Sequence, residues 1–304
     1  MKPRLIFLVG PTAVGKTGAA LVLAQKLNTQ IISCDSMQVY KGIDIISSKL
    51  PVDLQKKVRH HLIDVIRPTE EYNVSKYERA AFKKVKEITR KQKTPFFVGG
   101  TGLYMSVLID GIFKAKSENK RLRNKLYKEA ESRGSQYLHR RLMRVDPEAA
   151  AKIHPNDTKR IIRALEVFAA TGKPISYLQK QRKGLWGKYD IRIFGLNMQR
   201  NKLYARIEER VNKMFNKGLI SEVKRLLKLR LSKTASYAIG IKELEGYFDG
   251  LYDLEEAKRL IKRNTRLYAK RQLTWFRKDK RIEWVEIGDK EKPASIANRI
   301  FEKI

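Results

Sequence analysis

An unbroken phosphate-binding pattern lies close to the start of the chain. Residues 10–17 match G-x-x-x-x-G-K-[ST] without a gap. In such a loop the glycines let backbone amides converge on phosphate oxygens, the lysine adds a charge, and the hydroxyl can hold a magnesium ion. The pattern predicts a phosphate-binding loop (P-loop) with Mg²⁺ on Thr17, formed by Gly10, Pro11, Thr12, Ala13, Val14, Gly15, Lys16 and Thr17.

The chemistry at this loop depends on whether an acid accompanies it. P-loop ATPases also place a carboxylate at the end of another strand, where it holds magnesium through water. The run F-F-V-G-G-T-G delivers Gly99, Gly100 and Thr101 at that position instead. Asp64, in H-L-I-D-V, is a fallback whose plainer interpretation is a solvated strand end. The pattern therefore disfavours an NTP-driven motor and favours a site that binds a diphosphate and releases it whole.

Asp35 is the carboxylate best placed to act beside the P-loop. It ends an apolar run over residues 31–34, so we expect it at the carboxyl edge of a strand, where open α/β sheets bind ligands. The residues alone slightly favour another role, because D-S-M-Q is also typical of a turn or a helix cap. Both roles remain open at this point.

The elements that must position these residues alternate along the chain. Apolar runs at 4–10, 31–35, 61–65, 95–100 and 191–198 are separated by helical stretches, which predicts an α/β fold with a parallel sheet wrapped by helices. We assign residues 1–112 and 191–304 to this core, with helices at its C-terminal end. Residues 113–190 show no convincing strand and several charged helices, which predicts a helical insertion domain.

Charge is the most unusual bulk property of the chain. The 66 Lys and Arg against 32 Asp and Glu give a net charge of +34, which favours nucleic acid as a partner, although a lysine-rich genome would also raise it. The single cysteine, Cys34, and four histidines supply neither a disulfide nor a Cys/His zinc site. No apolar run reaches the length of a membrane helix and the start lacks a signal-peptide pattern, so we expect a cytoplasmic protein that does not bind membranes.

Seven blocks of the sequence resemble one family. They are GPTAVGKT, ISCDSMQVYKGIDI, HHLIDV, VGGTGLY, DPEAAAKIHPNDTKRIIRALEV, RIEERVNKM and TRLYAKRQLTWF. In this order, and over nearly the whole chain, they resemble bacterial tRNA dimethylallyltransferases. The resemblance implies a P-loop kinase-like core with a helical insertion. It also implies an enzyme that uses dimethylallyl diphosphate and Mg²⁺ to prenylate the exocyclic amine of the adenine 3′ of the anticodon, releasing pyrophosphate.

Catalytic roles follow from the same resemblance. It makes Asp35 the general base and Arg210 the arginine that binds pyrophosphate beside Lys16 and Thr17, so the implied catalytic residues are Asp35, Arg210 and Thr17. A carboxylate that takes the proton helps a poor amine nucleophile, and cations stabilise the departing pyrophosphate. Arg210 lies on an expected helix whose apolar stripe is Leu203, Ile207, Val211 and Met214. Without the resemblance, Arg206 and Arg210 would be interpreted as solvated arginines.

Contacts with a tRNA anticodon stem-loop are implied in several segments, and a monomer is expected. From the residues alone, Arg160 and Arg163 share one helix face, whereas Arg123 would be interpreted as solvated. Tyr237 could stack on a base or pack locally. The implied contacts are Asp35, Ser36, Met37, Gln38, Thr101, Arg123, Lys159, Arg160, Ile161, Ile162, Arg163, Tyr237, Ala238, Ile239, Gly240, Ile241 and Lys242.

The chain departs from the family pattern at three places. Ile46 stands where the family has a glycine that permits unusual backbone angles, so the resemblance does not fix the path of this loop. Val14 replaces a serine and Ile241 a tyrosine, and neither carries a proposed chemical role.

Three other functions compete with tRNA prenylation. An adenylate isopentenyltransferase acting on free nucleotide has little use for a charge of +34. A small-molecule P-loop kinase lacks its acid after F-F-V. A non-catalytic P-loop protein that binds RNA has no need of Asp35 paired with Arg210.

Overall fold

The computed structural model describes residues 2–113 and 119–304, which form two compact units. The first unit combines Met1–Leu108 with Trp186–Ile304, and the second spans Ile109–Leu185. The sequence placed the boundaries of the insertion at 113 and 190, a few residues further along the chain.

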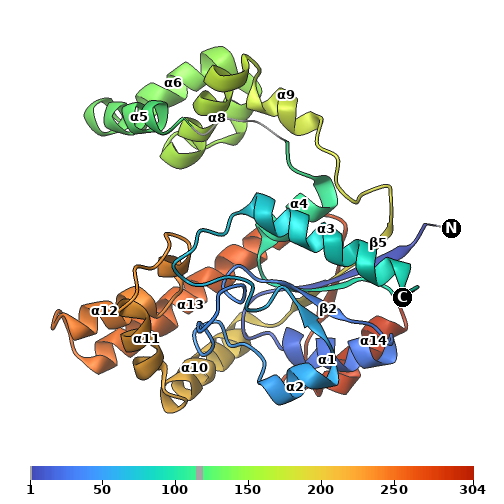
Figure 1. Ribbon diagram of the computed structural model, residues 1–304. Helices are drawn as coiled ribbons and strands as arrows, with labels where there is room; N and C mark the ends of the chain where they lie inside the picture. Colours follow the sequence, from blue (N-terminus) through green and yellow to red (C-terminus); the bar gives the residue numbers. More distant parts are fainter. Residues whose placement is uncertain (1, 114–118) are drawn as a thin grey trace. The chain divides into compact units, whose positions relative to one another are not determined.

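A six-stranded parallel sheet forms the centre of the first unit (Figure 1). Its order is β3-β2-β4-β1-β5-β6. Because all strands are parallel, their carboxyl ends lie at one edge, where ligands bind in such sheets. The predicted α/β fold is therefore confirmed. The strands are β1 (Arg4–Val9), β2 (Ile31–Cys34), β3 (His60–His61), β4 (Phe96–Gly99), β5 (Asp190–Asn197) and β6 (Ile282–Glu286).

Two strands differ from those that the sequence predicted. The strand expected at 61–65 is wrong, because only His60 and His61 pair with β2. Leu62 and Asp64 have φ of 62° and 54°, so the chain turns there. Strand β6 was missed because its alternating I-E-W-V-E pattern is short and lies among charged residues.

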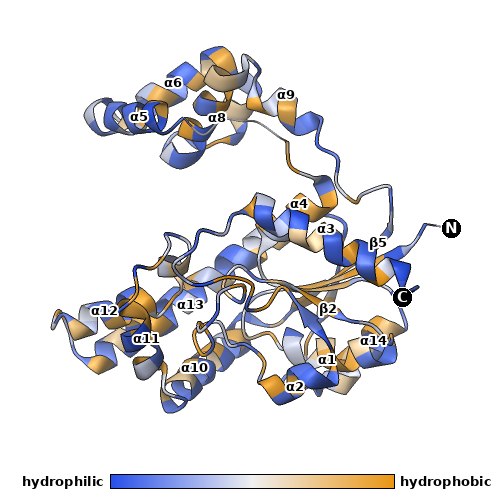
Figure 2. Cartoon of the chain, viewed as in Figure 1, coloured by the Kyte–Doolittle hydropathy of each residue, from blue (hydrophilic) through white to orange (hydrophobic). Residues whose placement is uncertain are grey.

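Helices cover both faces of the sheet. In Figure 1, α1 and α14 lie on one face and α3 on the other, and Figure 2 shows apolar residues concentrated in the strands between them. Helix α3 begins at an Asn73 cap and α13 at an Asp253 cap with two acids in its first turn. The helices of this unit are α1 (Lys16–Lys26), α2 (Val52–Lys57), α3 (Val74–Arg90), α4 (Gly102–Asp110), α10 (Arg200–Asn216), α11 (Leu219–Leu227), α12 (Ile241–Phe248), α13 (Leu254–Phe276) and α14 (Pro293–Phe301), with a short 3₁₀ turn at Ala235–Tyr237.

The second unit is helical throughout its described residues and has a core of its own. Leu126, Leu138, Leu142 and Ile161 are fully or almost fully buried in that core. Asp146 caps α7 by accepting from the Ala149 amide, and it also accepts from the Ser176 amide. The helices are α5 (Lys120–Arg133), α6 (Ser135–Val145), α7 (Pro147–Lys152), α8 (Thr158–Thr171) and α9 (Ile175–Lys180).

Within the described residues, no helix has the length and apolar content that crossing a bilayer requires.

Candidate active site

The P-loop makes a sharp turn between β1 and α1. Gly10 has φ 144°, and a Cβ there would lie 2.7 Å from the carbonyl oxygen of Leu196 on β5. Gly15, just before α1, is left-handed with φ 102°. Only glycine accommodates both the close approach and these backbone angles. The loop amides and the N-terminus of α1 therefore converge at the carboxyl edge of the sheet, a position that favours an anion.

Lys16 folds back over the loop that precedes it. Its Nζ donates to the carbonyl oxygens of Gly10 at 2.9 Å and Pro11 at 2.7 Å. The pKa of Lys16 is lowered to about 7, chiefly by burial and then by the charge of Arg210, while Asp35 opposes the shift. A negative charge near the ammonium group would favour the charged form of Lys16.

Asp35 follows β2 directly, stabilises the turn after that strand and lines the cavity beside the P-loop. Its Oδ1 accepts from the amides of Met37 at 2.8 Å and Gln38 at 3.4 Å, which stabilises the turn. Its charge also raises the pKa values of Lys16 and Arg210 against the larger effect of burial. Among the described residues Oδ2 receives no hydrogen bond, so it remains available to a ligand.

Arg210 projects into the site from α10. The expected stripe of Leu203, Ile207, Val211 and Met214 is buried, and Arg206 and Arg210 flank this stripe and line the cavity beside the P-loop. Burial lowers the pKa of Arg210, while Asp35 and Tyr268 oppose that effect.

One cavity of about 1120 Å³ brings most of these groups together. The predicted site residues that line it are Thr12, Ala13, Gly15, Lys16, Thr17, Asp35, Ser36, Met37, Gln38, Arg210, Tyr237, Ala238 and Ile239. Gly10, Pro11 and Val14 are buried behind the loop surface and support its path.

The glycines after β4 leave no space for the acid of a P-loop ATPase. A Cβ on Gly99 would overlap the backbone of Cys34 on β2. The fallback acid Asp64 is paired with Lys49, whose Nζ lies 2.6 Å from its Oδ1. Thr101 instead holds the segment after β2, because its Oγ1 accepts from the Ser36 amide at 3.0 Å.

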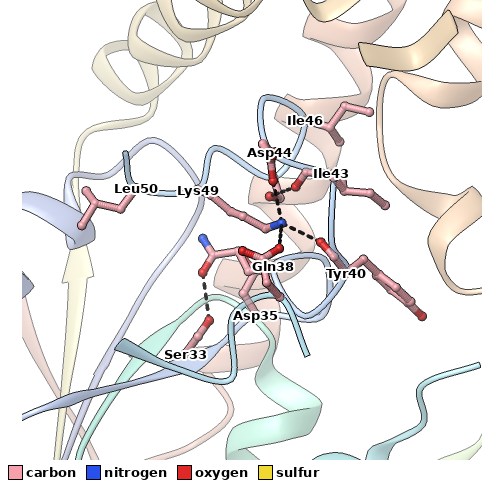
Figure 3. A network of polar contacts seen from close by, with 12 residues as sticks. Ser33, Asp35, Gln38, Tyr40, Ile43, Asp44, Ile46, Lys49 and Leu50 are labelled. Carbon is pink, nitrogen blue, oxygen red and sulfur yellow. Dashed lines mark hydrogen bonds and ion pairs between the residues drawn. The ribbon is translucent and has the colours of Figure 1, made fainter. Parts of the chain in front are cut away.

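A polar network fixes the loop that follows this segment (Figure 3). Lys49 Nζ bonds to the Tyr40 carbonyl oxygen at 2.6 Å and to the carboxylates of Asp44 and Asp64. From the other side, Glu222 on α11 accepts from three consecutive amides at residues 44–46. Three amide donors to one carboxylate fix the backbone path firmly.

The Ile46 departure is accommodated by this network. Ile46 is almost buried, at 8% exposure, and the left-handed residue of the loop is Ser48, with φ 48°. The loop therefore needs no glycine at position 46.

The tRNA contacts implied at residues 237–242 fall into two groups. Tyr237 is 53% exposed, and the Lys242 Nζ lies 5.5 Å from its ring centroid. The Ala238 and Ile241 side chains are buried, and Ala238 also lines the cavity. The Gly240 amide donates to Glu243 Oε2, which begins α12.

Some residues of the second unit that were expected to contact tRNA pair with other residues of the protein. Arg123 makes two hydrogen bonds to Glu166, at 3.1 and 3.0 Å, and Arg163 reaches the same carboxylate at 3.2 Å. Lys159 is exposed, and Arg160, 61% exposed at its side chain, pairs with Asp157 at 3.3 Å. The side chains of Ile161 and Ile162 are buried in the core of this unit, while their place among the implied RNA contacts stays a prediction.

The donor set fits Mg²⁺ only if a phosphate ligand completes it. Within the described part of the chain, no group of three or more His, Cys, Asp or Glu side chains could hold a metal. The Thr17 hydroxyl and the Asp35 carboxylate line the same cavity. Mg²⁺ commonly takes one or two protein oxygens, water and substrate phosphates, so this sparse set is compatible with the ion.

Several residues that shape the cavity were not among the site residues predicted from the sequence. They are Lys49 and Glu222 beside the loop, Arg206 near Gly15, and Tyr268 and Gln272 on α13. The last two lie four residues apart inside the T-R-L-Y-A-K-R-Q-L-T-W-F block, and that spacing on one helix face was the available signal.

Comparisons with known sequences give one consistent result. The family model described as IPP transferase matches residues 38–279. The chain is 49% identical over 303 residues to the tRNA dimethylallyltransferase of Carboxydothermus hydrogenoformans, covering 99% of this chain and 97% of that protein. It is 45% identical over 289 residues to the tRNA dimethylallyltransferase of Bacillus subtilis, with 94% and 91% coverage.

Solved structures give the same result. The full-length tRNA isopentenylpyrophosphate transferase from Bacillus halodurans matches with a TM-score of 0.70 and 41% identity, over 99% of this chain and 97% of that one. A eukaryotic dimethylallyltransferase described as acting on tRNA matches with a TM-score of 0.83 and 30% identity, over 98% and 77% of the two chains.

Proposed function

Because this chain belongs to the IPP transferase family, we propose that it transfers a dimethylallyl group from dimethylallyl diphosphate to an adenine amine of tRNA. Its relatives support the transferase class and the tRNA acceptor. The donor, and the adenine 3′ of the anticodon as the target, come from the motifs that the chain shares with the family. The observation that carries the proposal is the placement of Asp35 in one cavity with Lys16 and Arg210.

The P-loop side of the cavity binds the diphosphate of the donor. Backbone amides at the start of α1, Lys16 and Arg210 surround this position with positive charge. Bound through Thr17, Mg²⁺ would supply further neutralisation of the phosphate oxygens. These groups act most strongly as the bond from carbon to the bridging oxygen breaks, because the charge on pyrophosphate grows at that moment.

Asp35 acts on the acceptor. As the amine nitrogen bonds to the allylic carbon, the electron pair of the carbon–oxygen bond leaves with pyrophosphate and the nitrogen must lose a proton. Oδ1 is committed to the Met37 and Gln38 amides, so Oδ2 takes that proton. The amides keep the carboxylate oriented through the reaction.

The site is poorly equipped for the competing activities. An ATP-dependent motor or kinase needs a free acid beside the P-loop. At the end of β4, Gly99 packs so closely on Cys34 that no side chain fits there. The fallback acid, Asp64, is already paired with Lys49. A free-nucleotide prenyltransferase gains nothing from a net charge of +34, whereas an anticodon stem-loop presents many phosphates.

The test uses labelled dimethylallyl diphosphate with unmodified tRNA, AMP or ADP as the acceptor, and a phosphate-release assay with ATP. We expect label in tRNA alone, pyrophosphate as the released product, and competitive inhibition by pyrophosphate against the donor. Label in AMP or ADP in preference to tRNA would instead identify a free-nucleotide enzyme. Transfer that depends on ATP hydrolysis would contradict the assignment of the P-loop.

A further inference from the structure

We infer that Gln272 is a positioning residue that fixes the donor loop relative to the segment carrying the base. This inference rests on the proposed function. Gln272 lies on α13 and is 7% exposed. Its Oε1 accepts from the Thr12 amide of the P-loop at 2.8 Å, and its Nε2 donates to the Gly100 carbonyl oxygen at 2.9 Å.

The two hydrogen bonds require an amide side chain. The Thr12 partner is a donor and the Gly100 partner is an acceptor, so the residue between them must accept at one atom and donate at the other. Glutamate has no donor when ionised, and methionine offers only a weak acceptor. Either replacement leaves a backbone group at the site without its partner.

Steric contacts show how closely α13 packs on the segment after β4. A Cβ on Gly100 would overlap Gln272 Nε2, and a Cβ on Gly102 would overlap the ring of Trp275. These glycines therefore provide space for the helix. An alanine at position 100 would therefore displace the side-chain amide of Gln272.

The segment that Gln272 holds leads to the general base. Thr101 follows Gly100, its Oγ1 accepts from the Ser36 amide, and Ser36 adjoins Asp35. Tyr268, one turn before Gln272 on α13, lines the same cavity as Gln272 and Asp35. One helix thus restrains both the P-loop and the segment beside the base, and the distance between donor carbon and acceptor amine depends on it.

The first test compares Gln272→Met and Gly100→Ala with the wild type. We expect single-turnover transfer at saturating substrates to slow by about tenfold to a hundredfold, since a displacement near 1 Å costs about that much. The dissociation constant for tRNA should change by less than about threefold. Gln179→Met, at an exposed glutamine of α9, is the matched control and should keep the wild-type rate.

A pH profile of Gln272→Glu separates positioning from general destabilisation. Protonated glutamic acid can accept and donate, so it restores both hydrogen bonds. The rate ratio of Gln272→Glu to wild type should rise as pH falls from 8 to 6, because burial raises the pKa of the new carboxyl. The cations that line the same cavity, Lys16, Arg210 and Arg271, oppose this rise in the carboxyl pKa, whereas the charge of Asp35 reinforces it, so their balance sets the pH at which the ratio rises. The ratio for Gln272→Met should stay flat.

Hydrogen exchange keeps this inference distinct from the proposed activity. The Thr12 amide should exchange faster in Gln272→Met than in the wild type, whether or not the protein prenylates tRNA. Faster exchange in an enzyme inactive on tRNA would support the restraint while overturning the function. Wild-type rates in both Gln272→Met and Gly100→Ala, a flat ratio for Gln272→Glu, or unchanged exchange at Thr12 would overturn the inference.

Discussion

At the scale of single residues, Asp35 combines an oxygen that stabilises a turn with a second oxygen that takes the proton in the proposed reaction. Asn retains an oxygen for the Met37 and Gln38 amides but cannot take a proton, so Asp35→Asn isolates the chemical role. We expect single-turnover transfer to fall by at least about a hundredfold, as for the loss of a general base. Filter binding should show unchanged tRNA affinity.

Asp53→Asn is the matched control, because Asp53 is an exposed acid on α2, with only a 4.0 Å surface ion pair to Lys56. It should retain the wild-type rate. A normal rate in Asp35→Asn would show that another group accepts the proton.

Lys16 gives a prediction about protons that accompany binding. In the free protein its pKa is lowered from 10.5 to about 7, so at pH 8 much of the lysine is neutral. A bound diphosphate raises that pKa, which means that proton uptake accompanies binding above pH 7 and affinity falls as pH rises further. Calorimetry of pyrophosphate binding at pH 8 in buffers of different ionisation enthalpy measures the uptake.

Lys16→Arg is the control for that experiment, because arginine stays charged throughout this range. Proton uptake by the Lys16→Arg variant should be smaller than uptake by the wild type. The difference is the number of protons that Lys16 takes up on binding. Equal uptake in both proteins would show that Lys16 does not take up the protons.

The site residues that the sequence predicted depend on local spacing, whereas those that it missed depend on contacts between distant segments. The P-loop and the strand-end position of Asp35 follow from spacing within a few residues, which a pattern can reveal. Gln272 contacts Thr12 and Gly100, and Glu222 contacts residues 44–46, so both roles depend on contacts distant in sequence. Only the folded chain shows such pairs.

At the scale of elements, Glu166 joins α5 to α8 in the second unit. Its carboxylate is fully buried and is shared by Arg123 and Arg163. Arg123→Ala removes two charged hydrogen bonds, and we expect the free energy of unfolding to fall by about 1–3 kcal/mol, which denaturant titration measures. This loss of stability is smaller than that expected for a fully buried ion pair, because the Arg123 side chain is 39% exposed and Arg163 still pairs with Glu166 in the variant.

Arg121→Ala, at an exposed arginine on the same helix, should change stability by less than about 0.5 kcal/mol. If Arg123→Ala weakens tRNA binding while its stability stays at the wild-type level, the ion pair with Glu166 does not stabilise the fold and Arg123 contacts the RNA.

Elements with strong patterns were predicted and those with weak patterns were not. Four apolar runs became β1, β2, β4 and β5, and the buried stripe of α10 is confirmed. The run at 61–65 was equally apolar, but left-handed Leu62 and Asp64 end the pairing after His61. Apolar content alone does not report such a turn, because neither residue is a glycine.

At the scale of the whole molecule, the effect of net positive charge on tRNA affinity must be distinguished from the effect of specific contacts. A net charge of +34 attracts any polyanion, so affinity for tRNA alone does not identify a binding surface. The slope of log affinity against log salt is more informative, because it counts the phosphates that protein cations neutralise, at about 0.9 per contact in duplex.

Arg160 offers the cleanest test of a phosphate contact in the second unit. Its side chain is 61% exposed and its ion-pair partner Asp157 lies 3.3 Å away at the surface, whereas Arg163 is paired with buried Glu166 and would confound a double variant. We expect Arg160→Ala to weaken tRNA binding and to reduce the salt slope by roughly one unit. Pyrophosphate binding at the P-loop should be unchanged.

Arg90→Ala, at an exposed arginine that ends α3, is the control for loss of charge alone. Both variants lower the net charge equally, so a general electrostatic effect predicts equal, small changes in affinity and an unchanged slope. A local phosphate contact instead predicts that only Arg160→Ala loses slope, since counterion release depends on the neutralised phosphate and not on total charge. Filter binding of the anticodon stem-loop over a salt series decides between them, and identical slopes for the two variants would return Arg160 to the solvated surface of α8.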